Sequence, residues 1–142
     1  MSIARLEDAK KVITQTEDRR QNGWLMELFK DTTKTVLYLT ALNIGAFKGY
    51  HLHRVRAARY VCVKGKVKIT LQVPGTTNRE EYLLDSQKPQ RLFIPKDTAT
   101  GLLNMGGEEA WLINYPDPAY DPSLTDEQVE YNEEELKNRT VK

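Results

Sequence analysis

The stretch that decides the fold is GAFKGYHLHRVRAARYVCVKG, residues 45–65. It holds His51 and His53, the only histidines of the chain. If this segment is a β-strand, its period of two places both imidazoles on one face, where they can converge on a single atom. The stretch ends in Lys64-Gly65, which has a tight-turn composition. It therefore predicts a strand that carries two histidines, followed by a β-hairpin.

Short apolar runs separated by turn residues continue on both sides of this stretch. In Lys66–Val73, aliphatic and polar side chains alternate strictly, as in a strand with one buried face. Many short strands at regular spacing indicate an antiparallel sandwich or barrel, so the predicted fold class is all-β. The further expected strands are Trp24–Phe29, Thr35–Thr40, Glu81–Leu84, Arg91–Ile94 and Ala110–Tyr115.

The two ends of the chain differ from this core, which is expected to run from about residue 24 to about residue 122. Residues 1–23 are polar, and a weak pattern predicts a short helix at Ala4–Val12. In residues 123–142, Thr125–Gln128 resembles a capping box, and a solvated helix is expected through Leu136 with its acidic side chains in water. Residues 1–142 are expected to form one domain, because single domains usually span about 100–200 residues.

Composition excludes several classes of partner and site. The chain has 21 basic and 20 acidic residues, and a net charge of +1 argues against binding to a nucleic-acid polymer or an anionic membrane. Cys62 is the only cysteine, which excludes an internal disulfide and a Cys-rich zinc site. No apolar run approaches the roughly 20 residues of a membrane-spanning helix, and the first residues lack the apolar region of a secretory signal. We therefore expect no membrane partner and a cytoplasmic location.

The spacing around the histidines is that of the first cupin motif, G-x5-H-x-H-x4-E-x6-G. Gly45, His51, His53 and Gly65 occupy its positions, and Ala58 stands where the motif has Glu. A second match follows the spacing P-x-G-x2-H-x3-N. It comprises Pro95, Asp97, Thr100 and Asn104, with Thr100 at the histidine position.

The chain thus resembles a cupin, which implies a jelly-roll β-sandwich, here with short N- and C-terminal helical segments. In metal-binding cupins the two motifs supply three His and one Glu, but this chain keeps only His51 and His53 of that set. Two imidazoles leave a first-row metal with half of its usual protein ligands, and Cys62 falls on the following strand. We therefore expect neither a catalytic metal nor another cofactor. A metal-dependent cupin with unusual ligands is the least favoured of the three hypotheses for function that we consider; the other two follow.

Four segments resemble dTDP-4-dehydrorhamnose 3,5-epimerases and their relatives. Lys48–Arg54 is similar to the R/K-G-x-H segment of that family, and the other similar segments are Arg59–Val67, Arg91–Pro95 and Ile113–Pro122. The related dTDP-sugar 3,4-ketoisomerases carry a tyrosine thirteen residues before the first histidine, and Tyr38 stands there. The resemblance implies a metal-independent epimerase or ketoisomerase that acts on a nucleotide-linked 4-keto sugar.

Such a reaction needs a base beside the carbonyl carbon, an acid to return a proton, and a group that holds the enolate. The resemblance places His51 at the base position, and His53 on the same face is expected to orient it or to contact substrate. The acid is either Tyr38 or Tyr115, because Ile113 occupies the position of the family's tyrosine. A carboxylate partner for His51 is expected, with Asp117, Asp121 and Asp126 as candidates.

The resemblance also implies substrate-binding residues. Lys48 replaces the arginine of R-G-x-H and is expected to bind pyrophosphate or to stabilise an enolate. Arg59 and Arg91 are candidates for diphosphate contacts, and Thr100 and Asn104 are further candidates at the second motif.

The second hypothesis for function is a catalytically silent cupin that binds a sugar or a nucleotide sugar. We also predict a homodimer, because Trp24–Phe29 is apolar on both faces, more than an exposed edge strand should be.

Overall fold

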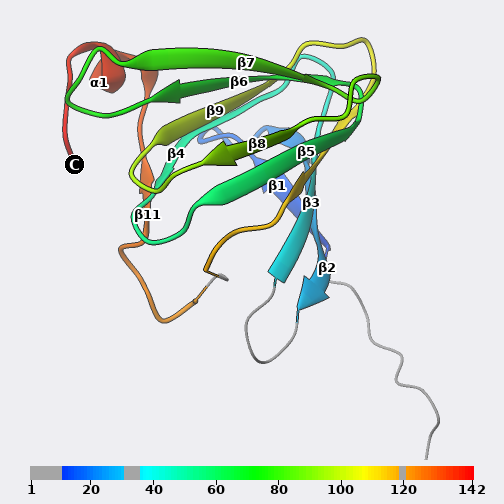
Figure 1. Ribbon diagram of the computed structural model, residues 1–142, viewed down its shortest axis with the longest axis horizontal. Coiled ribbons are helices and arrows are strands. Elements are labelled where there is room, and N and C mark those ends of the chain that lie inside the picture. Colours follow the sequence, from blue (N-terminus) through cyan, green and yellow to red (C-terminus); the bar gives the residue numbers. More distant parts are fainter. Residues whose placement is uncertain (1–10, 31–35, 119–120) are drawn as a thin grey trace, which may run out of the picture.

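The computed structural model describes residues 11–30, 36–118 and 121–142, without the side chains of residues 27–30. Its strands form two antiparallel sheets that lie over one another as the jelly-roll β-sandwich that the sequence predicts (Figure 1). The six-stranded sheet has the order β1 (Lys11–Gln15), β2 (Gln21–Lys30), β3 (Val36–Leu42), β10 (Ala110–Asn114), β5 (Ala58–Lys64) and β8 (Arg91–Ile94). The five-stranded sheet has the order β11 (Gln128–Glu130), β4 (Phe47–His53), β9 (Ala99–Asn104), β6 (Lys66–Gln72) and β7 (Arg79–Asp85). The short helix α1 (Glu133–Lys137) follows β11.

The main core lies between the two sheets and includes the fully buried side chains of Leu42, Val67, Ile69 and Leu112. In the first half of β6 the predicted alternation is confirmed, because Val67 and Ile69 are fully buried and Lys66 is exposed. Burial of such aliphatic side chains stabilises the fold by about 1.5–3 kcal/mol each. The alternation therefore identifies the face of β6 that forms the core.

A second, smaller core covers the outer face of the five-stranded sheet at one end. It consists of buried residues from β4, β9 and the C-terminal residues: Tyr50, Leu52, Ala99, Tyr131 and Leu136. Thr70 and Gln72 of β6 are buried as well, although strict alternation predicted them to be polar and outward. Gln72 lies beneath α1, where its side-chain Nε2 donates to the carbonyl of Leu136 at 3.1 Å.

The ends of the chain depart from the predicted helices. Lys11–Gln15 is a strand paired with β2, and most of the predicted helix at Ala4–Val12 lies outside the described residues. The predicted capping box at Thr125–Gln128 is wrong, because Gln128 begins a strand that hydrogen-bonds to β4. The helix begins only after Asn132, whose side chain and that of Glu135 form the actual capping box.

The apolar run Trp24–Phe29 falls in β2, which lies between β1 and β3 and is not an edge strand. β1 thus covers the edge whose exposure motivated the homodimer prediction, and the dimer itself stays a prediction. Within the described residues, no helix has the length and apolar character needed to cross a membrane.

Candidate active site

A β-bulge in β4 gathers three of the predicted site residues on the inner face of the sandwich. Between Lys48 and His51, β4 has one residue more than the facing stretch of β9, so the alternation of sides shifts by one. Lys48 therefore joins His51 and His53 on the wall of one cavity. Gly49 sits at the bulge with φ +133°, where a Cβ would come within 2.7 Å of the Thr100 carbonyl oxygen. The glycine is required by both its backbone conformation and this close approach.

Each histidine has a carboxylate partner from the C-terminal part of the chain. His51 Nδ1 lies 2.8 Å from a Glu130 carboxylate oxygen, and His53 Nδ1 lies 3.0 Å from Glu127 Oε2. β11 pairs antiparallel with β4, with Glu130 opposite His51 in the register, which explains the first contact. With each Nδ1 engaged by a carboxylate, Nε2 is the imidazole nitrogen left to exchange a proton with a ligand.

The two pairs differ in their surroundings. The Glu130 side chain is 52% exposed, whereas that of Glu127 is 6% exposed and also accepts from the backbone N–H and Nε of Arg56. Burial, together with the nearby Arg56 charge, lowers the pKa of His53, so this imidazole is neutral at pH 7. Burial alone would raise the pKa of Glu127, but the contacts with His53 and Arg56 outweigh it and lower that pKa.

The histidines open into a cavity of about 360 Å³ between the sheets. Lys48 and Tyr38, both singled out from the sequence, line the same cavity, as do Thr40 and Arg56. The Lys48 side chain is buried, and its Nζ donates to Thr40 Oγ1 at 3.1 Å. Burial lowers the pKa of Lys48 from 10.5 to about 8. A buried ammonium in a small cavity favours a ligand that carries or develops negative charge.

Four of the predicted site residues lie elsewhere. Tyr115 is exposed and stacks with the guanidinium of Arg59. Arg59 Nη2 also lies 3.6 Å from Asp117 Oδ2. Arg91 is exposed at the start of β8. Asn104 is buried and donates to the carbonyls of Leu42, Asn43 and Glu108, while its Oδ1 accepts from Gly106 N–H. Asn104 thus holds the connection between β9 and β10, and the acid candidate inside the cavity is Tyr38.

The four ligand positions of the cupin motifs meet as their spacing predicts. His51, His53, Ala58 and Thr100 line a small recess of about 40 Å³ beside the larger cavity. Thr100 faces His51 in the β4–β9 register, and its hydroxyl donates to the Thr98 carbonyl. Ala58 offers no donor atom, and in the described part of the chain no three His, Cys, Asp or Glu side chains are grouped as metal ligands. This donor set does not fit the metal centre of metal-binding cupins.

A wider groove of about 910 Å³ runs between β1 and the edge formed by β4 and β11. Thr14, Lys48 and His51 line both this groove and the histidine cavity, so the two spaces adjoin. The groove is also lined by the aromatic pair Phe47 and Tyr50, whose ring centres are 5.3 Å apart. His51 thus lies where this groove meets the cavity.

The carboxylate partners were missed in the sequence. The prediction of Asp117, Asp121 or Asp126 is wrong, because Glu130 contacts His51, and the expectation that the acidic tail is only solvent-facing fails for Glu127 and Glu130. The signal available was the alternation of Gln128, Val129, Glu130 and Tyr131, which is that of a short strand and not of a helix.

This sandwich with two inward-facing histidines on one strand defines a cupin-type domain. The chain belongs to the family described as polysaccharide biosynthesis C-terminal domain, which matches residues 16–128. A curated relative, from Haloferax volcanii, is named probable low-salt glycan biosynthesis epimerase Agl13. It is 25% identical over 120 residues, which cover 76% of this chain and 77% of the relative.

Solved structures show the same fold. The capsular polysaccharide assembling protein CapF from Staphylococcus aureus superposes with a TM-score of 0.72 and 18% identity over 84% of this chain. The match covers 34% of CapF, so this chain spans about a third of that protein. A cupin-2 domain from Rhodospirillum rubrum gives a TM-score of 0.72 and 14% identity, with 96% of this chain and 84% of that one covered.

Proposed function

We propose that this chain is a metal-independent epimerase or ketoisomerase that acts on a nucleotide-linked 4-keto sugar. The observation that carries the proposal is the His51–Glu130 pair at the wall of a cavity that also holds the buried Lys48 ammonium. A base held by a carboxylate, beside a cation, is what proton removal next to a carbonyl requires. The epimerase name of the Haloferax relative supports the same class of reaction.

In this mechanism His51 Nε2 takes the proton from the carbon beside the carbonyl, and the C–H electron pair becomes the enolate. The Glu130 carboxylate accepts from Nδ1–H and stabilises the imidazolium that forms. Lys48 stabilises the negative charge on the enolate oxygen. Return of a proton to the opposite face of the same carbon gives epimerisation. Ketoisomerisation instead places a proton on the former carbonyl carbon, whose oxygen becomes a hydroxyl, while the hydroxyl on the deprotonated carbon gives up its proton and becomes the new carbonyl.

Tyr38 is the proposed acid, because it is the tyrosine of the two candidates that lines the cavity. The neutral imidazole of His53, held by Glu127, is proposed to orient the substrate or to relay a proton. The cavity of about 360 Å³ falls in the size range of small-molecule sites and can take one sugar ring.

The test is exchange of sugar protons with solvent. The protein is incubated in D₂O with a dTDP-linked 4-keto-6-deoxy sugar, and deuterium incorporation is followed by NMR, with His51→Ala as the control. Incorporation beside the carbonyl by the parent alone supports the proposal, and the position of the label separates epimerase from ketoisomerase. Binding of the nucleotide sugar without exchange favours the silent sugar-binding cupin and overturns the enzymatic proposal.

A further inference from the structure

Both carboxylates of the candidate site belong to one short C-terminal segment, residues 127–142, which we call the carboxylate arm. β11 within it has only three residues and pairs with β4 alone. Three-residue strands have little stability of their own, and a half-exposed contact such as His51–Glu130 contributes at most about 1 kcal/mol. The position of Glu130 therefore depends on what holds the rest of the arm.

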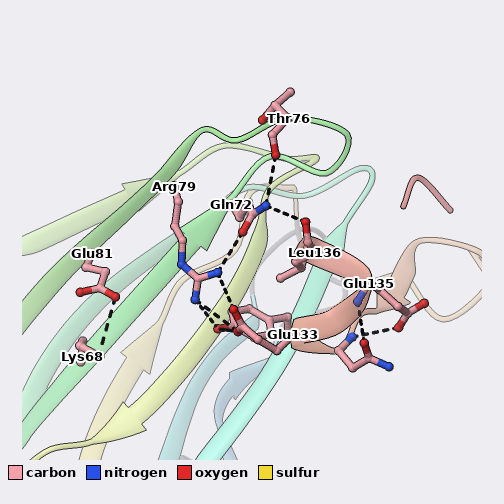
Figure 2. Close-up of polar contacts among 10 residues, drawn as sticks. Lys68, Gln72, Thr76, Arg79, Glu81, Glu133, Glu135 and Leu136 are labelled. Carbon is pink, nitrogen blue, oxygen red and sulfur yellow. Dashed lines mark hydrogen bonds and ion pairs between the residues drawn. The ribbon is translucent and has the colours of Figure 1, made fainter. Parts of the chain in front are cut away.

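Arg79, at the start of β7 on the far edge of the five-stranded sheet, provides such an anchor. Figure 2 shows its guanidinium between Glu133 of α1 and Gln72 of β6. Its Nη1 donates to Glu133 Oε1 at 2.8 Å and to Gln72 Oε1 at 3.0 Å, and its Nη2 lies 3.3 Å from Glu133 Oε2. The two-pronged contact fixes the orientation of the carboxylate as well as its position.

The same cluster reaches the strand of the histidines. Arg79 Nη2 donates to the hydroxyl of Tyr50 at 3.0 Å, and this hydroxyl donates to Glu133 Oε2 at 2.6 Å. Tyr50 directly precedes His51, and Glu133 is three residues beyond Glu130. Arg79 thus joins the strand that carries the base to the arm that carries its carboxylate.

Gln72 completes the attachment. Its side-chain Nε2 donates to the Leu136 carbonyl at the end of α1 and to the Thr76 carbonyl, contacts that are visible in Figure 2. Leu136 is 1% exposed in the second core. The helix is therefore held at its first residue by Arg79 and near its last by Gln72, which Arg79 itself orients.

We infer that Arg79 is a positioning residue that holds the carboxylate arm so that Glu130 stays against His51 Nδ1. Arg79 lines none of the described cavities around the histidines and acts through its contacts with Glu133, Tyr50 and Gln72. Its importance for turnover rests on the proposed function. Its effect on the His51 hydrogen bond does not.

The hydrogen bond can be measured without substrate, because only two histidines contribute imidazole signals. Long-range ¹H–¹⁵N NMR of the full chain reports which ring nitrogen carries the proton, and His51→Gln assigns the signals. In the parent, acceptance by Glu130 favours the Nδ1–H tautomer of neutral His51. Arg79→Gln is expected to raise the Nε2–H share, and Arg79→Lys, which keeps one contact, is expected to do so less.

Arg59→Gln is the matched control, since Arg59 also bonds a carboxylate but lies away from the arm. It should leave the His51 signals unchanged. Glu133→Gln should repeat the effect of Arg79→Gln, and the double variant should add little to either. Unchanged His51 signals in folded Arg79→Gln or Arg79→Lys, or an equal change in Arg59→Gln, would overturn the inference.

Turnover supplies a second readout if the parent exchanges sugar protons. Arg79→Gln should then lower kcat several-fold with KM nearly unchanged, and Arg79→Lys should recover part of the loss. If the parent shows no exchange, the proposed function fails, while the imidazole signals still decide the role of Arg79.

Discussion

Glu130 faces His51 across the β4–β11 pairing, with a carboxylate oxygen 2.8 Å from the imidazole Nδ1. Two residues along β4, His53 makes a similar contact with Glu127 at 3.0 Å, but there the carboxylate is buried and shared with Arg56. Two pairs of the same chemistry thus lie side by side in different surroundings. The more exposed pair, His51–Glu130, can exchange a proton with a ligand. The buried pair, His53–Glu127, is suited to fix the position of the His53 imidazole.

Glu130→Gln should therefore damage turnover more than stability. Glutamine keeps the shape of the side chain but cannot stabilise an imidazolium by its charge, so we expect kcat to fall about 10- to 100-fold. The free energy of unfolding should change by less than about 1 kcal/mol, because the pair is half exposed. Steady-state kinetics and urea unfolding measure both quantities. Glu134→Gln, an exposed neighbour on α1, is the control, and an active Glu130→Gln variant would refute the role of the pair.

Glu127→Gln should have the opposite profile. Removal of this buried charge leaves Arg56 without the carboxylate that accepts from its backbone and side chain, which should destabilise the fold by about 2–4 kcal/mol. Because the pKa of Glu127 is lowered in the folded state, it stabilises the protein above its unfolded pKa near 4.5, and this contribution is lost as the pH falls below that value. Measured by urea unfolding from pH 6 to pH 3, the free energy of unfolding should depend less steeply on pH in Glu127→Gln than in the parent. An unchanged slope would contradict the role assigned to this carboxylate.

Much of the sandwich could be predicted because its strands follow the period of two. β6 and β8 agree closely with the predicted ranges, and burial alternates along β8 and along the first half of β6. β9 was not predicted from its sequence, ATGLLN. The rings of Phe47 and Tyr50 pack against Gly101 and leave no room for a side chain there. The strand therefore lacks a regular alternation of polar and apolar residues.

For the candidate site too, the sequence predicted the features that depend on local periodicity and missed those that depend on contacts between distant segments. That His51 and His53 share a face is a local property of one strand, so the sequence was sufficient to predict it. The contact of His51 with Glu130 joins residues 79 positions apart. It depends on the register of β11 against β4, which no local pattern specifies. Lys48 was predicted as a site residue only through the resemblance. The bulge that turns it inward interrupts the strand period of two, so its face could not be predicted from that period.

Lys48→Met should stabilise the protein while it abolishes turnover. The shift of the Lys48 pKa from 10.5 to about 8 means that the folded state binds this proton more weakly than the unfolded chain does. Stability therefore rises with pH between about 8 and 10.5, and at pH 7 the buried charge costs up to about 3 kcal/mol. Methionine removes that cost, so we expect the free energy of unfolding at pH 7 to increase by about 1–3 kcal/mol. Parent activity should fall as the pH rises through about 8, where the cation is lost.

Lys68→Met is the control for Lys48→Met, since Lys68 is partly exposed and paired with Glu81. It should change stability by less than about 1 kcal/mol and leave turnover intact. A Lys48→Met variant that is both less stable and fully active would show that the ammonium has neither of the roles given to it.

Gly49→Ala tests the bulge. A Cβ at position 49 would lie 2.7 Å from the Thr100 carbonyl oxygen and 2.9 Å from Gly101 Cα, both backbone atoms that cannot move aside cheaply. We expect a loss of about 2–4 kcal/mol in the free energy of unfolding, and loss of turnover because the bulge that contains this glycine lies between Lys48 and His51. Gly107→Ala, where an added Cβ meets nothing within 4 Å, should be nearly neutral. Equal stability of the two variants would refute the packing argument.

Chelation tests the absence of a catalytic metal, which the donor set at the motif positions predicts. Of the four cupin ligand positions only His51 and His53 carry imidazoles, while Ala58 has no donor and Thr100 has a neutral hydroxyl. Deuterium exchange into the sugar should therefore survive prolonged treatment with a strong chelator and show no gain on addition of zinc, iron or manganese.

His51→Ala completes this test, because loss of a base and loss of a metal ligand have different effects on the response of exchange to added metal. Loss of the base should abolish exchange in the presence and in the absence of added metal, with the fold intact by circular dichroism and with the nucleotide sugar still bound. If chelation stops exchange in the parent and one metal restores it, the histidines are ligands and the metal-free mechanism is wrong. If His51→Ala retains the parent rate, His51 is peripheral, and the base must be sought at His53, whose neutral imidazole lines the same cavity.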